Sequence, residues 1–96
     1  MKYRAIDEMN QLLTDTNDLR HAKEMHYEFG GVFLDMDLYR EVKAIMAKNY
    51  DDYHAEEYDT RFNYTKFNKA VDYIHDGAMM EIDDFSAMCA YVRCVG

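Results

Sequence analysis

The residues best suited to chemistry lie in one short stretch, from Tyr50 to Asp59. It reads Tyr-Asp-Asp-Tyr-His-Ala-Glu-Glu-Tyr-Asp, with five carboxylates, three tyrosines and no Lys or Arg. Its charge is therefore -5, whereas an even share of the net charge of -8 over 96 residues would give ten residues about -1. Carboxylates four residues apart on a helix lie about 6 Å from each other, close to the phosphate spacing of a nucleic-acid strand. These residue types favour electrostatic attraction of Lys and Arg side chains, with tyrosines as rigid contact anchors.

A second acidic segment lies nearer the C-terminus. No basic residue occurs between Lys69 and Arg93, and the acids of that segment give it a charge of -5. We predict that the two segments contribute to one partner-binding surface. Its predicted residues are Tyr50, Asp51, Asp52, Tyr53, Glu56, Glu57, Tyr58, Asp59, Asp72, Asp76, Asp83 and Asp84.

The expected partner is the basic surface of a nucleic-acid-binding protein or nuclease complex. The net charge of -8 and the pI near 4.8 argue against direct binding of nucleic acid or of an anionic membrane, since both require Lys and Arg. In the alternative interpretation the acids form a solvated face that serves only solubility. The chain would then be a structural or adaptor domain that forms a homodimer through apolar helix faces.

In size and composition, the whole chain resembles small phage-encoded proteins that block bacterial defence nucleases, including DNA mimics and anti-CRISPR inhibitors. Those proteins are short, acidic, rich in Tyr, Asp and Glu, and lack enzyme motifs. The resemblance implies a non-enzymatic inhibitor that acts in the cytoplasm of a host cell. It includes no diagnostic motif, so it assigns no role to any residue.

One short segment is similar to a catalytic motif. The run Val-Phe-Leu-Asp35-Met-Asp37-Leu resembles the first motif of haloacid-dehalogenase-type phosphatases, in which an apolar strand delivers a nucleophilic Asp and a second Asp acts as acid and base. Leu38 stands where that motif has Gly, and the usual Thr or Val does not follow. Helix capping explains Asp37 equally well. We therefore predict no catalytic residues and no enzyme.

Metal-ligand spacing is incomplete wherever it occurs. His54 and Glu57 are three residues apart but form no three-ligand zinc set. Residues 72–83 place Asp-Gly at positions five and six of a calcium-binding loop, but Ile74 stands where an oxygen ligand is needed. We predict no metal site and no cofactor.

The two cysteines are expected to be inert. Five residues apart on one helix, Cys89 and Cys94 would point about 140° apart, which disfavours a disulfide between them. Neither has a histidine close in sequence, and Arg93 is their only basic neighbour. Reduced thiols, the absence of an apolar leader and the absence of a long apolar run favour a cytoplasmic protein.

Apolar spacing and cap residues predict helices through most of the chain. Proline is absent and glycine occurs only four times, so few residues interrupt helices. We predict a single domain spanning residues 1–96 with a mainly α fold, a compact bundle of four to six short helices. A small two- or three-stranded sheet from residues 32–34, 62–64 and 79–82 is the α+β alternative. The helices are expected at residues 3–14 and 17–29, after a cap at Asp35 or Asp37, at 50–58, at 66–76 with Thr65 as cap, and after a cap at Asp83 or Asp84. The expected core is Ile6, Leu12, Leu19, Phe29, Leu38, Val42, Ile45, Phe67, Val71, Ile74, Phe85, Met88 and Val92.

Overall fold

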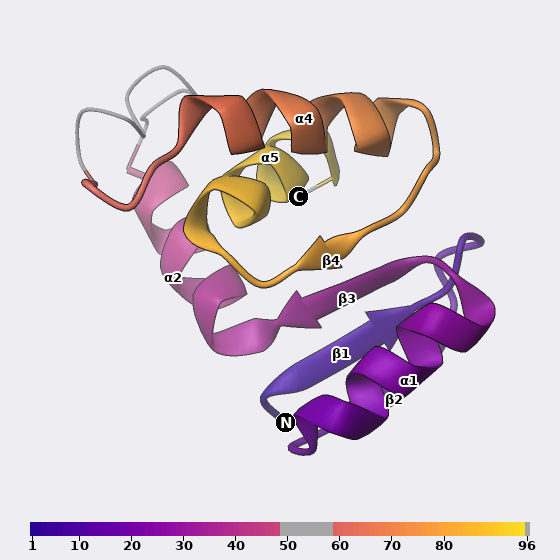
Figure 1. The fold of residues 1–96 in the computed structure, drawn as a ribbon. Helices are drawn as coiled ribbons and strands as arrows, with labels where there is room; N and C mark the ends of the chain where they lie inside the picture. Colours follow the sequence, from indigo (N-terminus) through magenta and orange to yellow (C-terminus); the bar gives the residue numbers. More distant parts are fainter. Residues whose placement is uncertain (49–58, 96) are drawn as a thin grey trace.

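The computed structural model describes residues 1–48 and 59–95 of the chain (Figure 1). In these ranges the elements are β1 (Tyr3–Ile6), β2 (Leu12–Thr16), α1 (Leu19–Phe29), β3 (Val32–Asp35), α2 (Met36–Met46), α4 (Tyr64–His75), β4 (Glu81–Ile82) and α5 (Phe85–Val95). The strands form one sheet in the order β2-β1-β3-β4. β3 and β4 are parallel, and the other neighbours are antiparallel.

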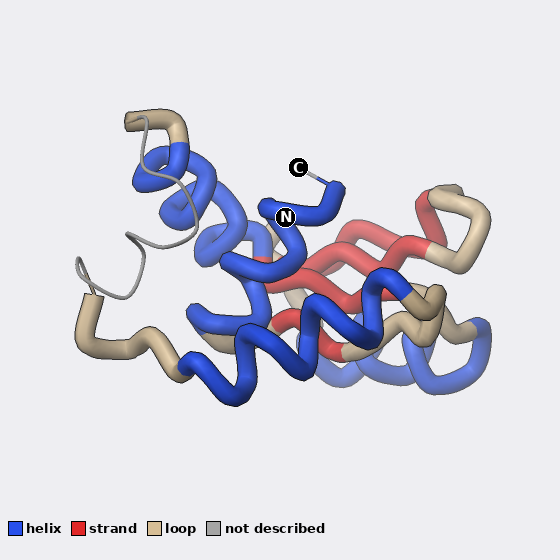
Figure 2. The backbone as a smooth tube through the Cα atoms, turned by 90° about the horizontal axis from the view of Figure 1, so that it is seen from above, coloured by secondary structure: helices blue, strands red, loops and turns tan. Residues whose placement is uncertain are grey.

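The prediction of a mainly helical bundle is wrong, because a mixed sheet forms the middle layer of the described fold. α1 packs against β1, β2 and β3, while α2 and α5 contact β3 and β4, and α4 lies along α5 (Figure 1). Figure 2 shows the same elements from above, with the strands lying next to one another. The fold is therefore α+β.

The N-terminal segment accounts for much of this error. Residues 3–14 form the antiparallel hairpin of β1 and β2 rather than a helix. The Asp7 carboxylate accepts hydrogen bonds of 2.9 and 2.8 Å from two backbone amides of the turn, and Asn10 adopts a φ of 62°. Asn and Asp stabilise such turns because their short side chains bond to nearby backbone and tolerate left-handed conformations. The chain therefore reverses direction where a helix was expected to continue.

The predicted helix at 17–29 is confirmed as α1, which is capped by Asp18 and followed by two glycines. Gly31 has a φ of 82°, and a Cβ atom at this position would lie 2.0 Å from the carbonyl oxygen of Ile6. Only glycine fits this close crossing of the chain over β1. The crossing directs the chain from α1 into β3, at the centre of the sheet.

Other predicted boundaries shifted. The segment 62–64 is not a strand, since Phe62 and Asn63 belong to no helix or strand and α4 begins at Tyr64. The cap of α4 is Asn63, not Thr65, because the Asn63 side chain accepts from the amide of Lys66 at 3.0 Å. The segments 32–34 and 79–82 contain β3 and β4. The predicted helix at 50–58 lies outside the described residues.

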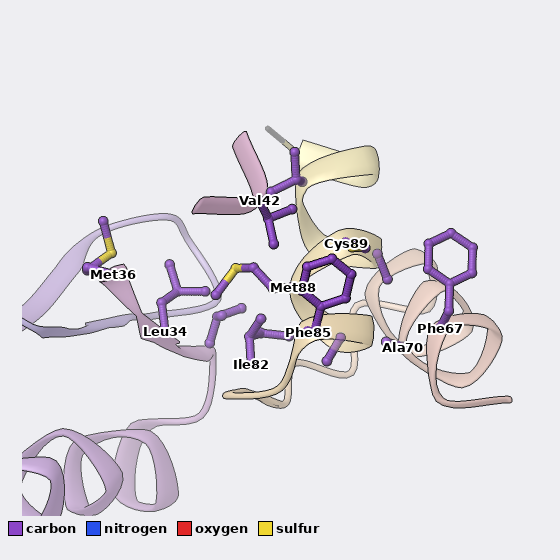
Figure 3. Packing of buried hydrophobic residues seen from close by; sticks show 13 residues of the cluster. Leu34, Met36, Val42, Phe67, Ala70, Ile82, Phe85, Met88 and Cys89 are labelled. Atoms are coloured by element: carbon purple, nitrogen blue, oxygen red, sulfur yellow. The ribbon is translucent and has the colours of Figure 1, made fainter. Parts of the chain in front are cut away.

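The main core lies between the sheet and the helices α2, α4 and α5 (Figure 3). Val42, Phe67, Phe85, Met88 and Val92 are buried there as predicted. Three predicted core residues are instead exposed, because the N-terminal hairpin and α1 face the core differently from the expected helices. These are Leu12, Leu19 and Phe29, which are 58%, 41% and 52% exposed.

Candidate functional site

A groove of about 460 Å³ opens where the carboxyl ends of β3 and β4 meet the first turns of α2 and α5. Five of its eight lining side chains are carboxylates, and only one is basic. At neutral pH the lining therefore carries a net charge of -4. We call it the acidic groove; it is lined by Asp35, Asp37, Leu38, Glu41, Arg61, Asp83, Asp84 and Phe85.

The parallel pairing of β3 with β4 brings two of these carboxylates together. Asp35 is the last residue of β3 and Asp84 follows β4, so both lie at the same edge of the sheet. Each also caps a helix: Asp35 accepts from two amides of α2 at 3.0 and 3.2 Å, and Asp84 accepts from the amide of Ala87 at 2.9 Å. The positive end of a helix dipole stabilises a negative charge at this position.

Asp37 and Glu41 lie four residues apart on α2 and share one face of that helix. Asp37 pairs with Arg40 at 3.1 Å, and both side chains are more than 60% exposed. Glu41 receives a hydrogen bond of 2.7 Å from Arg61. Asp83 is exposed, and within the described ranges it has no hydrogen-bond or ion-pair partner. Asp37 and Asp83 thus offer the carboxylates of the groove that are least engaged.

Arg61 is the single cation of the lining. Its Nε donates to Asp59 at 2.9 Å, its Nη2 donates to Glu41, and its guanidinium lies 4.4 Å from the centroid of the Phe85 ring. The hydrogen bonds from Arg61 hold the pKa of Asp59 below its usual value. Asp59, and then Glu41, raise the pKa of Arg61. The groove therefore already holds one guanidinium between carboxylates and an aromatic ring.

The predicted surface is only partly brought together. Asp83 and Asp84 line the groove, and Asp59 lies at its margin through Arg61. Asp72 is exposed on α4 instead, and Asp76 is exposed at the carboxyl-terminal cap of that helix. Asp76 lies ten residues beyond Lys66, the residue of α4 that pairs with Asp84, which is about 15 Å along the helix axis. The predicted residues Tyr50, Asp51, Asp52, Tyr53, Glu56, Glu57 and Tyr58 lie outside the described residues.

Sequence reasoning did not assign four charged residues of the groove to a binding surface. Asp35 and Asp37 were considered only as helix caps or phosphatase residues, and Glu41 and Arg61 were given no role. The available signal was an Asp at the start of each of two helices that follow apolar segments. It becomes informative only once β3 and β4 are known to be parallel neighbours.

The structure gives no support to the two chemistries considered for isolated motifs. The phosphatase-like Asp35 is engaged by α2 amides, and Asp37 is paired with Arg40. The first four residues of the calcium-loop-like segment 72–83 belong to α4. His, Cys, Asp and Glu residues outside the gap at 49–58 form no group of three that could hold a metal ion.

Comparison of the chain with protein-family models, with curated proteins and with solved structures gave no match. Function must therefore be inferred from the chain's own residues. Over residues 1–48 and 59–95, no helix has the length and apolar character needed to cross a membrane.

Proposed function

We propose that this protein is a non-enzymatic inhibitor that uses the acidic groove to bind Lys and Arg side chains of a basic partner. The partner would be a nucleic-acid-binding protein or a nuclease complex, such as a bacterial defence nuclease. The inhibitor would occupy the site that otherwise contacts phosphates, in the manner of the anti-CRISPR proteins and DNA mimics that the chain resembles in composition. It would act in the cytoplasm, a reducing compartment in which a buried thiol such as that of Cys89 stays reduced.

The observation that carries this proposal is the convergence of five carboxylates on one groove with a single arginine. The carboxylates come from three segments: β3, α2 and the turn between β4 and α5. Its volume of about 460 Å³ falls within the range of about 300–1,000 Å³ that ligand pockets occupy. Ligand pockets are mostly apolar, whereas this lining is mostly charged, so cationic side chains suit it better than an apolar molecule.

The contacts of Arg61 support the proposal that the groove binds a guanidinium group in preference to an ammonium group. Its own guanidinium lies against Phe85 and is bound by two carboxylates. Arginine matches carboxylates through its planar fork and stacks on aromatic rings better than lysine does. A partner arginine that enters beside Asp37 and Asp83 would make contacts of the same kind.

The test is competition with DNA. A panel of basic bacterial nucleic-acid-binding proteins and nucleases is loaded with fluorescent duplex DNA, and release of the DNA by this protein is followed by anisotropy at low and high salt. We expect at least one panel member to lose its DNA, with inhibition that weakens as salt is raised.

Two matched variants locate the surface. The groove variant carries Asp37→Asn, Glu41→Gln and Asp83→Asn, and leaves the capping residues Asp35 and Asp84 intact. The control variant carries Glu28→Gln, Asp72→Asn and Asp76→Asn, three exposed acids outside the groove that change the net charge equally. The groove variant should lose inhibition and the control should keep it.

Other outcomes would contradict the proposal. Equal loss in both variants would mean that net charge, rather than the groove, attracts the partner. Loss only in the control variant would favour the surface predicted on α4. A salt-insensitive homodimer without any competition against DNA would favour the structural or adaptor alternative.

A further inference from the structure

The fold brings a histidine to one of the two cysteines. The Sγ atom of Cys94, in the last turn of α5, lies 4.0 Å from Nε2 of His75, in the last turn of α4. These residues are 19 positions apart in the chain, and the packing of α4 on α5 brings them together. His75 is therefore a neighbour of Cys94 in space, although it is distant from Cys94 in sequence.

The two thiols differ in access to solvent. Cys94 is partly exposed, and His75 beside it is exposed. Cys89 lies one turn and a half earlier on the same helix and is only 1% exposed within the core. A reagent in solution can therefore approach the sulfur of Cys94 but not that of Cys89.

Both residues lie at the carboxyl ends of their helices. A helix amino end, which would stabilise a thiolate, is therefore not what would activate Cys94. The imidazole of His75 is a base placed beside the sulfur instead. Arg93 carries a positive charge on α5, but its guanidinium lies over the ring of Phe67 at 5.6 Å.

We propose that Cys94 is a modification site that forms mixed disulfides with small disulfide molecules, and that His75 is the base that activates it. Nε2 of His75, in the tautomer that carries no proton there, takes the proton from Sγ of Cys94. The resulting thiolate attacks one sulfur of the disulfide. A new sulfur–sulfur bond forms to Cys94 as the original one breaks, and the departing thiolate takes the proton from the imidazolium. Cys94 is oxidised and the leaving sulfur is reduced.

The test uses an aromatic disulfide whose released thiolate is coloured, added in excess to the folded chain, with oxidised glutathione as a second probe detected by intact mass. We expect one fast-reacting thiol in the wild type. Cys94→Ser should remove the fast phase, and Cys89→Ala should retain it.

His75→Gln should slow the fast phase about tenfold, which is below what positioned acid–base groups contribute in enzymes. His21→Gln, which removes a histidine from α1 instead, is the matched control and should react like the wild type. Thermal melts of the variants establish that they are folded. If His75→Gln does not fold, His75→Asn provides a second substitution. The proposal is overturned if the folded His75 variant reacts as fast as the wild type, or if the fast phase persists in Cys94→Ser.

Discussion

Replacing Arg61 with Gln should destabilise the protein by about 1–2 kcal/mol at neutral pH. Arg61 bridges Glu41 and Asp59 and stacks on Phe85. Arg61 and Glu41 are about half exposed, at 49% and 48%, so their ion pair contributes no more than about 0.2–1 kcal/mol. The pair with the less exposed Asp59 adds a similar amount, and the cation–π contact adds about 0.5–1 kcal/mol. These contributions share one side chain, so their full sum is an upper limit.

The difference in free energy of unfolding between Arg61→Gln and the wild type should depend on pH in a defined direction. The pKa of Asp59 is lowered from its ordinary value of 3.8 by hydrogen bonds from Arg61. A depressed carboxyl pKa contributes stability above the unfolded-state pKa, and this contribution is lost as the pH falls through the folded-state pKa. The free energies of unfolding of the two proteins should therefore differ by a constant amount between about pH 7 and pH 5. This difference should become smaller below about pH 4.

Urea unfolding followed by circular dichroism, repeated across this pH range, measures the effect. In thermal melts each kcal/mol should lower Tm by about 4–8 °C for a chain of this size. Arg20→Gln is the control, because Arg20 is 87% exposed and its partner among the described residues is Glu24, one helical turn away. It should cost less than about 0.5 kcal/mol. If Arg61→Gln is no less stable than Arg20→Gln, or if the difference grows in acid, the groove is not organised around Arg61 as described.

Arg61→Gln should lower the stability of the protein but strengthen its binding to a basic partner. Without Arg61 the lining of the groove changes from a net charge of -4 to -5, and Glu41 and Asp59 lose their internal cation. A basic partner should then bind more tightly, although the protein alone is less stable. Weaker DNA competition by folded Arg61→Gln would instead assign Arg61 to the partner contact itself.

Two further substitutions test how the groove is positioned. Asp35→Ala removes the cap of α2 and should lower the free energy of unfolding, measured in urea, by about 1 kcal/mol. A much smaller loss would mean that the two capping hydrogen bonds contribute little. Gly31→Ala places a methyl group 2.0 Å from the backbone oxygen of Ile6 at a φ of 82°, so it should prevent folding or cost well over about 2 kcal/mol by the same measurement. Gly77→Ala is its control, since Gly77 has a φ of 75° but no atom lies within 4 Å of where its Cβ would be. This substitution should cost only the conformational strain of about 1–2 kcal/mol. Equal losses of stability in the two variants would refute the close crossing at Gly31.

Helices that carry both an amphipathic pattern and a cap were predictable from the sequence. α1 combines regular apolar spacing with Asp18 and two terminal glycines, and α2 combines it with Asp35. The hairpin of β1 and β2 was not predictable in this way. Both strands are half-buried along most of their length, and polar and apolar residues do not alternate clearly in them. Five apolar residues of this segment coincided with helical spacing: Tyr3, Ile6, Met9, Leu12 and Leu13. The turn residues Asp7 and Asn10 carried the contrary signal.

The candidate site was less accessible to sequence reasoning because local charge density and spatial proximity are different properties. Asp72 and Asp76 are close in sequence to Asp83 and Asp84 but lie on a different part of the surface. Asp35, by contrast, is nearly fifty residues from Asp84 and adjoins it through the pairing of β3 with β4. Strand order, which no local pattern reveals, determined which acids share the groove.

The surplus of negative charge in the groove raises the question of how the folded chain tolerates it without a partner. Two helix amino ends stabilise Asp35 and Asp84, and Arg61 stabilises Glu41 and Asp59. Asp37 has only an exposed pair with Arg40, and Asp83 has no partner in the described ranges. Repulsion is therefore relieved where the acids are held by the fold and remains where they face solvent. An incoming cation would meet carboxylates that are already fixed in position, so it would gain their attraction without first having to order them.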